Sequence, residues 1–178
     1  GASVEGRGRF GDSDITDLTG AVAIDSENAG VRLTNIGGNV RVETRKSDVV
    51  RVVNCKGNVE LKGNGGDIEL EAIEGQASVN GNYRGDITLR KMAKPVRFES
   101  SRTELRFERL PGFVQMTRGD LSINDVIGPV YLRGANKDVE MTNITAGVDV
   151  QVERGDVTLR PGKLPLGKTE VRTNSGDI

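Results

Sequence analysis

The chain has 178 residues, a length that suits one domain with its own hydrophobic core. Its 25 basic and 26 acidic residues give a net charge of -1, which argues against a general affinity for nucleic acid or acidic lipid. Histidine is absent, which excludes the commonest general base and the commonest zinc ligand. The sequence contains no apolar run long enough to span a membrane. Cys55 is the only cysteine, so it forms no internal disulfide and is expected to be a small buried hydrophobe.

An apolar–polar–apolar triplet recurs along the whole chain. Its first residues are Val22, Val31, Val40, Val50, Val59, Ile68, Ala77, Ile87, Val96, Leu105, Val114, Leu121, Val130, Val139, Val148 and Val157. Successive positions lie nine or ten residues apart, except for seven between Val114 and Leu121. Alternation with a period of two is typical of β-strands, whereas apolar residues of a helix recur at intervals of three and four. The pattern therefore predicts an all-β protein.

Every second triplet is followed by one further apolar residue, so the true repeat is about 18 residues. These expected corner residues are Leu18, Ile36, Cys55, Ile73, Met92, Leu110, Val126, Ile144 and Leu164. A unit of this size buries its apolar side chains only by stacking on further copies. We therefore predict one domain over 1–178, a single-stranded parallel β-solenoid (β-helix) with roughly eight to nine coils and about five inward apolar side chains per coil. The crossover rule for parallel strands favours a right-handed winding.

Stacking also predicts which outward residues become neighbours in adjacent coils. Arg41 should lie beside Glu60, and Arg51 beside Glu69. An uninterrupted solenoid further places Arg97 beside Gln115. Two turns depart from the rhythm, a longer one at 81–85 and a shorter one at 117–120. Because the last residues, Gly-Asp-Ile, stop within a repeat, we expect the chain to be a fragment of a longer protein.

The repeated Gly-Asp pairs suggest two interpretations. Calcium-binding β-rolls also repeat every nine residues, but their aspartate stands two places before the apolar residue. Here Asp67, Asp86, Asp120, Asp138 and Asp156 directly precede it. This placement favours aspartates that accept hydrogen bonds from turn backbone. Acidic residues are spread along the chain and no long loop could wall a cleft, so we expect no catalytic site, no cofactor and no metal.

Basic residues concentrate in the segment 83–119, which has nine lysines or arginines against four acids, a local charge of +5. The candidate residues for an anionic ligand, such as a surface glycan or envelope polymer, are Arg84, Arg90, Lys91, Lys94, Arg97, Arg102, Arg106 and Arg109; Arg118 lies in the same segment. Tyr83, Phe113 and Tyr131 are candidate sugar-stacking rings. The alternative is that these residues form ordinary solvated strand surface.

The repeated Gly-Asp-apolar pattern, together with the stretches 93–105 (AKPVRFESSRTEL) and 163–167 (KLPLG), resembles the bacterial adhesin-type β-strand-repeat domains. The resemblance covers nearly the whole chain and implies a cell-envelope or extracellular location, with a non-enzymatic role as an adhesin or ligand-presenting rod. It supplies no active-site motif. A bactofilin-like scaffold that self-assembles through its coil ends is the main alternative, and a carbohydrate-active β-helix enzyme is a weaker one. A monomer and end-to-end association therefore both remain open.

Overall fold

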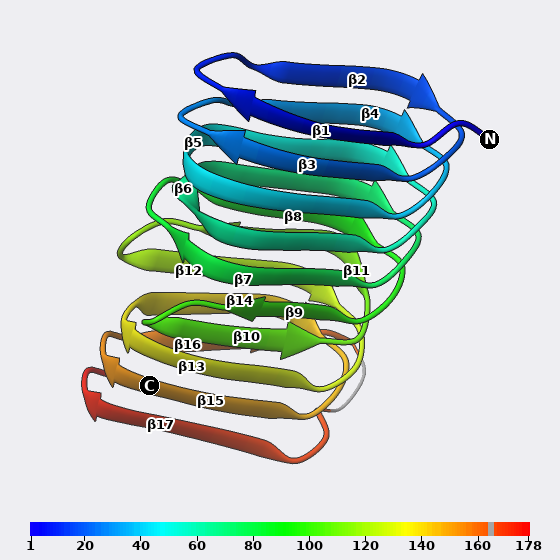
Figure 1. The fold of residues 1–178 in the computed structure, drawn as a ribbon. Coiled ribbons are helices and arrows are strands. Elements are labelled where there is room, and N and C mark those ends of the chain that lie inside the picture. The colour runs from blue at the N-terminus through cyan, green and yellow to red at the C-terminus, as the bar shows by residue number, and fades with distance from the viewer. Residues whose placement is uncertain (164–165) are drawn as a thin grey trace.

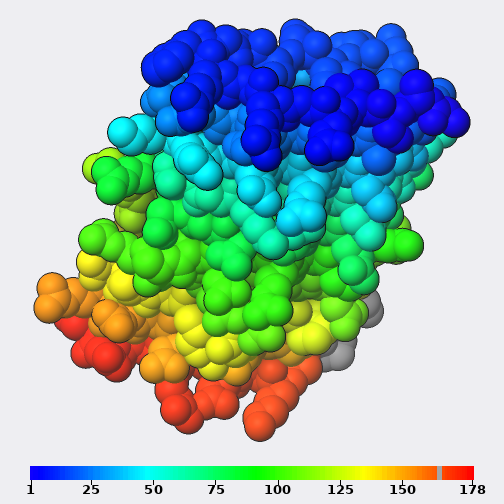
Figure 2. Space-filling view, viewed as in Figure 1, coloured from blue at the N-terminus to red at the C-terminus, as the bar shows by residue number. Residues whose placement is uncertain are grey.

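The computed structural model describes residues 1–163 and 166–178 and confirms the β-solenoid. In the described residues, 17 strands form one continuous sheet that winds into about nine turns of about 18 residues, and no helix occurs (Figure 1). In the space-filling view the colours succeed one another along the axis, as expected when each coil packs on its neighbours (Figure 2). The rod has two broad faces, which we call front and back as they stand in Figure 1.

The front face contains β1 (Val4–Arg9), β3 (Val22–Glu27), the first parts of β5 (Val40–Cys55) and β6 (Val59–Ile73), β7 (Ala77–Tyr83), β9 (Val96–Glu99), β10 (Thr103–Phe107), β13 (Val130–Asn136), β15 (Val148–Arg154) and β17 (Thr169–Ser175). The back face contains β2 (Ser13–Leu18), β4 (Val31–Ile36), the later parts of β5 and β6, β8 (Ile87–Met92), β11 (Leu110–Met116), β12 (Asp120–Val126), β14 (Asp138–Ile144) and β16 (Val157–Pro161). Strands within each face are hydrogen-bonded side by side.

The core is a column of thin apolar layers between the two faces. The coil that begins at Val40 contributes Val40, Val42, Val50, Val52 and Cys55, none of them more than 1% exposed. These are the five inward side chains that the sequence predicts. Each side chain of this size contributes about 1.5–3 kcal/mol when fully buried. Because a single coil is open above and below, this burial depends on the coils that cover it.

A backbone kink precedes seven of the expected corner residues, but not Leu110. The residue directly before a corner adopts the left-handed conformation, with φ between 51° and 59°, at Asp17, Asn35, Asn54, Ala72, Lys91, Asp125 and Asn143. Asparagine and aspartate tolerate this conformation better than other residues with a side chain. Their side chains can also form hydrogen bonds from one coil to the next. For example, the Asn54 amide donates to Asn35 Oδ1 at 3.0 Å. The expected corner at Leu164 lies outside the described residues.

One coil of the stack runs backward. After β9 the chain turns at 100–102, and β10 returns antiparallel to it, with Val96 opposite Phe107. β11 is antiparallel to β8 on the back face, and a second hairpin at 117–119 leads into β12, which is antiparallel to β11. From there the parallel stacking resumes, with β12 beside β14. The short turn at 117–120 is therefore the second of two hairpins that reverse the chain.

The reversal corrects part of the predicted outward arrangement. Arg41 lies beside Glu60 as predicted, and Arg51 lies beside Glu69 with Nε 3.4 Å from Oε2. Arg97, however, lies opposite Arg106 on the front face, and Gln115 belongs to the back face between Thr88 and Ser122. The prediction for Arg97 and Gln115 was wrong because the hairpin keeps the chain on the front face where a forward coil would cross to the back.

Candidate functional site

The two hairpins leave an opening in one edge of the solenoid, the left edge of Figure 1, which we call the turn edge. Elsewhere on this edge, a turn carries the chain from the front face to the back, as residues 84–86 do after β7 and Lys137 does after β13. Between these two turns, each hairpin stays on its own face, so no described segment crosses. Three strand steps separate β7 from β13, or about 14 Å at the usual spacing. A cavity of about 450 Å³ fills this gap.

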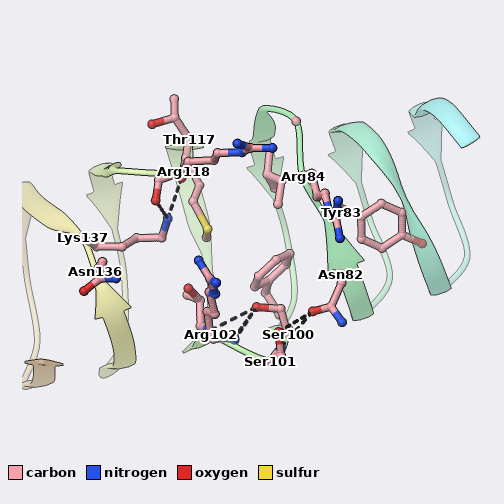
Figure 3. Close-up of a pocket in the computed structure, with 15 residues that line it drawn as sticks. Asn82, Tyr83, Arg84, Ser100, Ser101, Arg102, Thr117, Arg118, Asn136 and Lys137 are labelled. Carbon is pink, nitrogen blue, oxygen red and sulfur yellow. Dashed lines mark hydrogen bonds between the residues drawn. The ribbon is translucent and has the colours of Figure 1, made fainter. Parts of the chain in front are cut away.

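The lining of the cavity combines apolar, polar and cationic residues (Figure 3). Ile87, Phe98 and Met116 supply apolar surface from the core. The polar lining comprises Asn82, Ser100, Ser101, Thr103, Thr117 and Asn136, and the charged lining comprises Arg84, Arg102, Arg118 and Lys137. Among the described residues, no aspartate or glutamate lines the cavity. This composition suits an anion.

The hairpin that presents Arg102 is fixed by hydrogen bonds to itself and to the coil above it. The Ser101 backbone N–H and hydroxyl donate to Asn82 Oδ1 at 3.0 and 2.8 Å. Ser100 Oγ accepts from the backbone N–H of Thr103 at 3.0 Å, and the Ser100 N–H donates to the Thr103 carbonyl at 2.8 Å. These bonds, drawn as dashed lines in Figure 3, tie the loop to the neighbouring coil beside the cavity.

Lys137 holds the other hairpin. Its side chain extends from the turn after β13, and Nζ donates to the carbonyls of Thr117 and Arg118 at 2.5 and 3.0 Å. Lys137 is only 7% exposed, and this burial lowers the pKa of its ammonium group, an effect that nearby Asp120 opposes. Two of the three ammonium donors are thus used to fix the turn that presents Arg118.

The cations of the cavity differ from other cations of the chain in their partners. In the described part of the chain, no carboxylate oxygen lies within 4.0 Å of a charged nitrogen of Arg84, Arg102, Arg118 or Lys137. On the front face, by contrast, Arg97 pairs with Glu99 at 3.5 Å and Arg106 with Glu104 at 3.4 Å. The positive charge of the cavity is therefore not neutralised by a direct ion pair.

The structure distributes the eight predicted basic residues over several surfaces. Arg84 and Arg102 line the cavity, whereas Arg97 and Arg106 lie on the front face. Arg90 and Lys91 stand at the end of β8 on the back face, and Lys94 and Arg109 lie in links at the opposite edge. The charge count over 83–119 included Arg118 but missed Lys137, which lies one coil further along the sequence. The two-residue shortening at 117–120 was the signal that could have revealed the second hairpin.

The three candidate stacking rings have different surroundings. Tyr83 is buried, with its hydroxyl 2.9 Å from Thr44 Oγ1. Two guanidinium groups lie over the Tyr131 ring, with Arg106 Cζ at 4.1 Å and Arg133 Cζ at 4.2 Å from its centroid. Phe113 is 36% exposed and lies on β11.

Three of the five aspartates that directly precede an apolar residue accept a hydrogen bond from turn backbone. Asp67 Oδ1 accepts from the backbone N–H of Asp86 at 2.8 Å, Asp138 Oδ1 from that of Asp156 at 2.9 Å, and Asp156 Oδ1 from that of Asp177 at 2.8 Å. These three aspartates link their own coil to the next, as the interpretation of hydrogen-bonded turn aspartates expects. Among residues 1–163 and 166–178, no group of three or more His, Cys, Asp or Glu side chains is arranged to hold a metal ion. The same residues include no helix that is long and apolar enough to cross a membrane.

Comparisons with protein-family models, with curated proteins and with solved structures found no match.

Proposed function

We propose that the chain is a non-enzymatic module of the cell envelope or surface, an adhesin or ligand-presenting rod that holds an anionic glycan or envelope polymer. The observation that carries the proposal is the cavity at the double reversal, where Arg84, Arg102, Arg118 and Lys137 face one opening and form no ion pair with a carboxylate of the described residues. The envelope location is supported by the sequence resemblance of the repeats.

The charge distribution supports anion binding at this place. A concave site with low-dielectric walls focuses the field of its charges and raises the local concentration of counter-ions. Guanidinium groups present a planar fork of donors that matches carboxylate, sulfate and phosphate oxygens. The hydrogen bonds of the two hairpins fix the backbone that carries Arg102 and Arg118 and hold the Lys137 ammonium group before a ligand arrives. Less of the protein then has to become ordered on binding, which favours affinity.

The test compares two double variants that remove the same charge. In Arg84→Gln/Arg102→Gln the cavity loses two unpaired cations, whereas Arg97→Gln/Arg106→Gln removes two cations that are paired on the front face. Binding is measured by isothermal calorimetry against heparin, polygalacturonate and polyphosphate, with dextran as the neutral control. We expect the cavity variant to lose at least about tenfold in affinity, since each charged hydrogen bond contributes about 1.5–3 kcal/mol. The front-face variant should bind like the parent chain.

Two outcomes would refute this proposal. Equal losses in both variants, with unchanged thermal melting, would mean that net charge rather than the cavity governs binding. Turnover of any of these polymers would restore the carbohydrate-active alternative. Sedimentation velocity over a wide concentration range tests the scaffold alternative, which predicts association that grows with concentration in the absence of polymer.

A further inference from the structure

We propose that the cavity recognises a tetrahedral oxyanion group, a phosphate monoester or a sulfate, carried on the ligand, and that Lys137 is its deepest contact. This inference rests on the proposed function, because it names the anionic group that the same cavity binds. The burial of Lys137 and the four different turns that supply the cations support it.

Lys137 is a cationic residue that is only 7% exposed. The carbonyls of Thr117 and Arg118 accept two of its donors, but carbonyls are dipoles and leave the net charge uncompensated. A buried charge without a counter-ion is unfavourable, and it becomes tolerable when an opposite charge is placed beside it. Asp120 acts on the Lys137 ammonium group only from beyond ion-pair distance, and no other carboxylate of the described residues comes within that distance. A bound anion would therefore supply the close counter-charge. The third ammonium donor is available for that contact.

The four cations come from four different turns. Arg84 follows β7, Arg102 lies in the front hairpin, Arg118 lies in the back hairpin, and Lys137 follows β13. In Figure 3 these side chains surround the cavity rather than lining one wall. A carboxylate presents two oxygens in one plane and carries one charge, which a single arginine fork can satisfy. A phosphate monoester presents three terminal oxygens in different directions and carries about -1.5 to -2 charges. The arrangement therefore matches the tetrahedral group better.

Lys137 also positions a second cation. Its bonds to the Thr117 and Arg118 carbonyls fix the turn from which the Arg118 side chain extends. Loss of the ammonium group would remove one contact to the anion and release the loop that supplies another.

The experiment uses small probes that share one sugar. Glucose 6-phosphate, glucose 6-sulfate, glucuronate and glucose are titrated into the full chain by calorimetry, and each then competes against the polymer that the chain binds. We expect the phosphate or the sulfate to bind at least tenfold more tightly than glucuronate. The ratio between these two probes then identifies which group the site prefers. Glucuronate binding that equals or exceeds both would overturn the inference.

The matched variants are Lys137→Met and Lys94→Met, since Lys94 lies in a link at the opposite edge. Lys137→Met should abolish the preference over glucuronate, whereas Lys94→Met should retain it. If Lys137→Met does not fold, Arg118→Gln keeps the lysine and its backbone bonds and should reduce the same ratio severalfold. If Lys137→Met or Arg118→Gln leaves the affinity ratio of the phosphate or sulfate probe to glucuronate unchanged, the assignment of the cavity to a tetrahedral oxyanion is wrong.

Two results separate this inference from the proposed function. If polymer binding depends on Arg84 and Arg102 but the phosphate, sulfate and glucuronate probes bind equally well, only this inference is refuted. If polymer binding does not depend on those two arginines, the proposed function itself is refuted.

Discussion

The Tyr83 hydroxyl lies 2.9 Å from Thr44 Oγ1 in the interior of the stack and joins residues that are 39 positions apart. Thr44 is 2% exposed, and its hydroxyl can donate to the Asn64 carbonyl at 3.2 Å while it accepts from Tyr83. Tyr83 directly precedes Arg84, so this bond anchors the turn that carries one of the cavity cations. Stability of the core and geometry of the candidate site are thus coupled at one residue.

Tyr83→Phe should reduce the free energy of unfolding by about 1 kcal/mol, the usual contribution of one hydrogen bond. Burial raises the pKa of Tyr83 above its ordinary value of 10.0, an effect that the Thr44 hydrogen bond opposes. Because the folded pKa exceeds the unfolded one, the tyrosine's contribution is complete below about pH 10 and is lost as pH rises through the folded pKa. Urea unfolding at pH 8 and pH 11 should therefore show a smaller pH effect in the variant. If the free energy of unfolding falls by the same amount between pH 8 and pH 11 in the parent chain and in Tyr83→Phe, Tyr83 is not the group whose pKa is raised by folding.

Ser47→Ala should stabilise the protein. Ser47 is 3% exposed, and its hydroxyl has no hydrogen-bond partner among the described residues. An unpaired buried hydroxyl costs about 1–3 kcal/mol, so its removal should raise the free energy of unfolding by about 1 kcal/mol. The control is Ser26→Ala, because the buried Ser26 hydroxyl donates to the Ala29 carbonyl at 3.2 Å. Urea denaturation should move the two midpoints in opposite directions, and a loss of stability in both variants would count against the prediction.

Ala72→Asn should also stabilise the stack, for a backbone reason. Ala72 has a φ of 54° at the kink before a corner, where the neighbouring coil has Asn54. A left-handed conformation costs an ordinary residue about 1–2 kcal/mol, and asparagine tolerates it better. The new amide could also extend the bond between Asn54 and Asn35. We expect a gain of about 1 kcal/mol in thermal or urea unfolding, whereas Ala72→Val should lose stability because a β-branched residue fits this φ poorly. A Val variant as stable as the Asn variant would show that the kink is not strained.

The inward and outward assignments can be tested within one strand. Ile73 is fully buried at a corner, whereas Glu69 is an outward residue paired with Arg51 at 3.4 Å. Ile73→Asp places a charge in a thin core and should abolish cooperative unfolding of the coils around it. Glu69→Thr removes one exposed ion pair and should cost less than about 1 kcal/mol. Circular dichroism melts should separate the two variants clearly, and equal tolerance would mean that the two faces of the strand are misassigned.

The repeat in the sequence was sufficient to predict the coils, because burial requires an apolar residue at every second position of each short strand. It could not reveal the direction of the chain, since a strand that runs backward keeps the same alternation. Leu105 and Phe107 are buried on reversed β10, as a forward strand of the same sequence would bury them. The cavity exists only because of that reversal. The local charge was therefore sufficient to name Arg84 and Arg102 as candidate anion-binding residues. It could not predict that they line the same cavity as Lys137.

The reversal itself can be tested by cross-linking. In Arg97→Cys/Arg106→Cys the two cysteines lie directly opposite each other on antiparallel strands, where Cα atoms are about 4.5–5.5 Å apart and a disulfide can form. In Arg97→Cys/Gln115→Cys they lie on opposite faces of the rod, so this pair should remain reduced. Cys55 is buried, and that burial raises the pKa of its thiol, which limits its competition under mild oxidation. Mass spectrometry of the non-reduced proteins identifies the bond. A disulfide in the second pair but not the first would mean that the chain winds forward without interruption, and that the crossing turn closes the edge where the cavity lies.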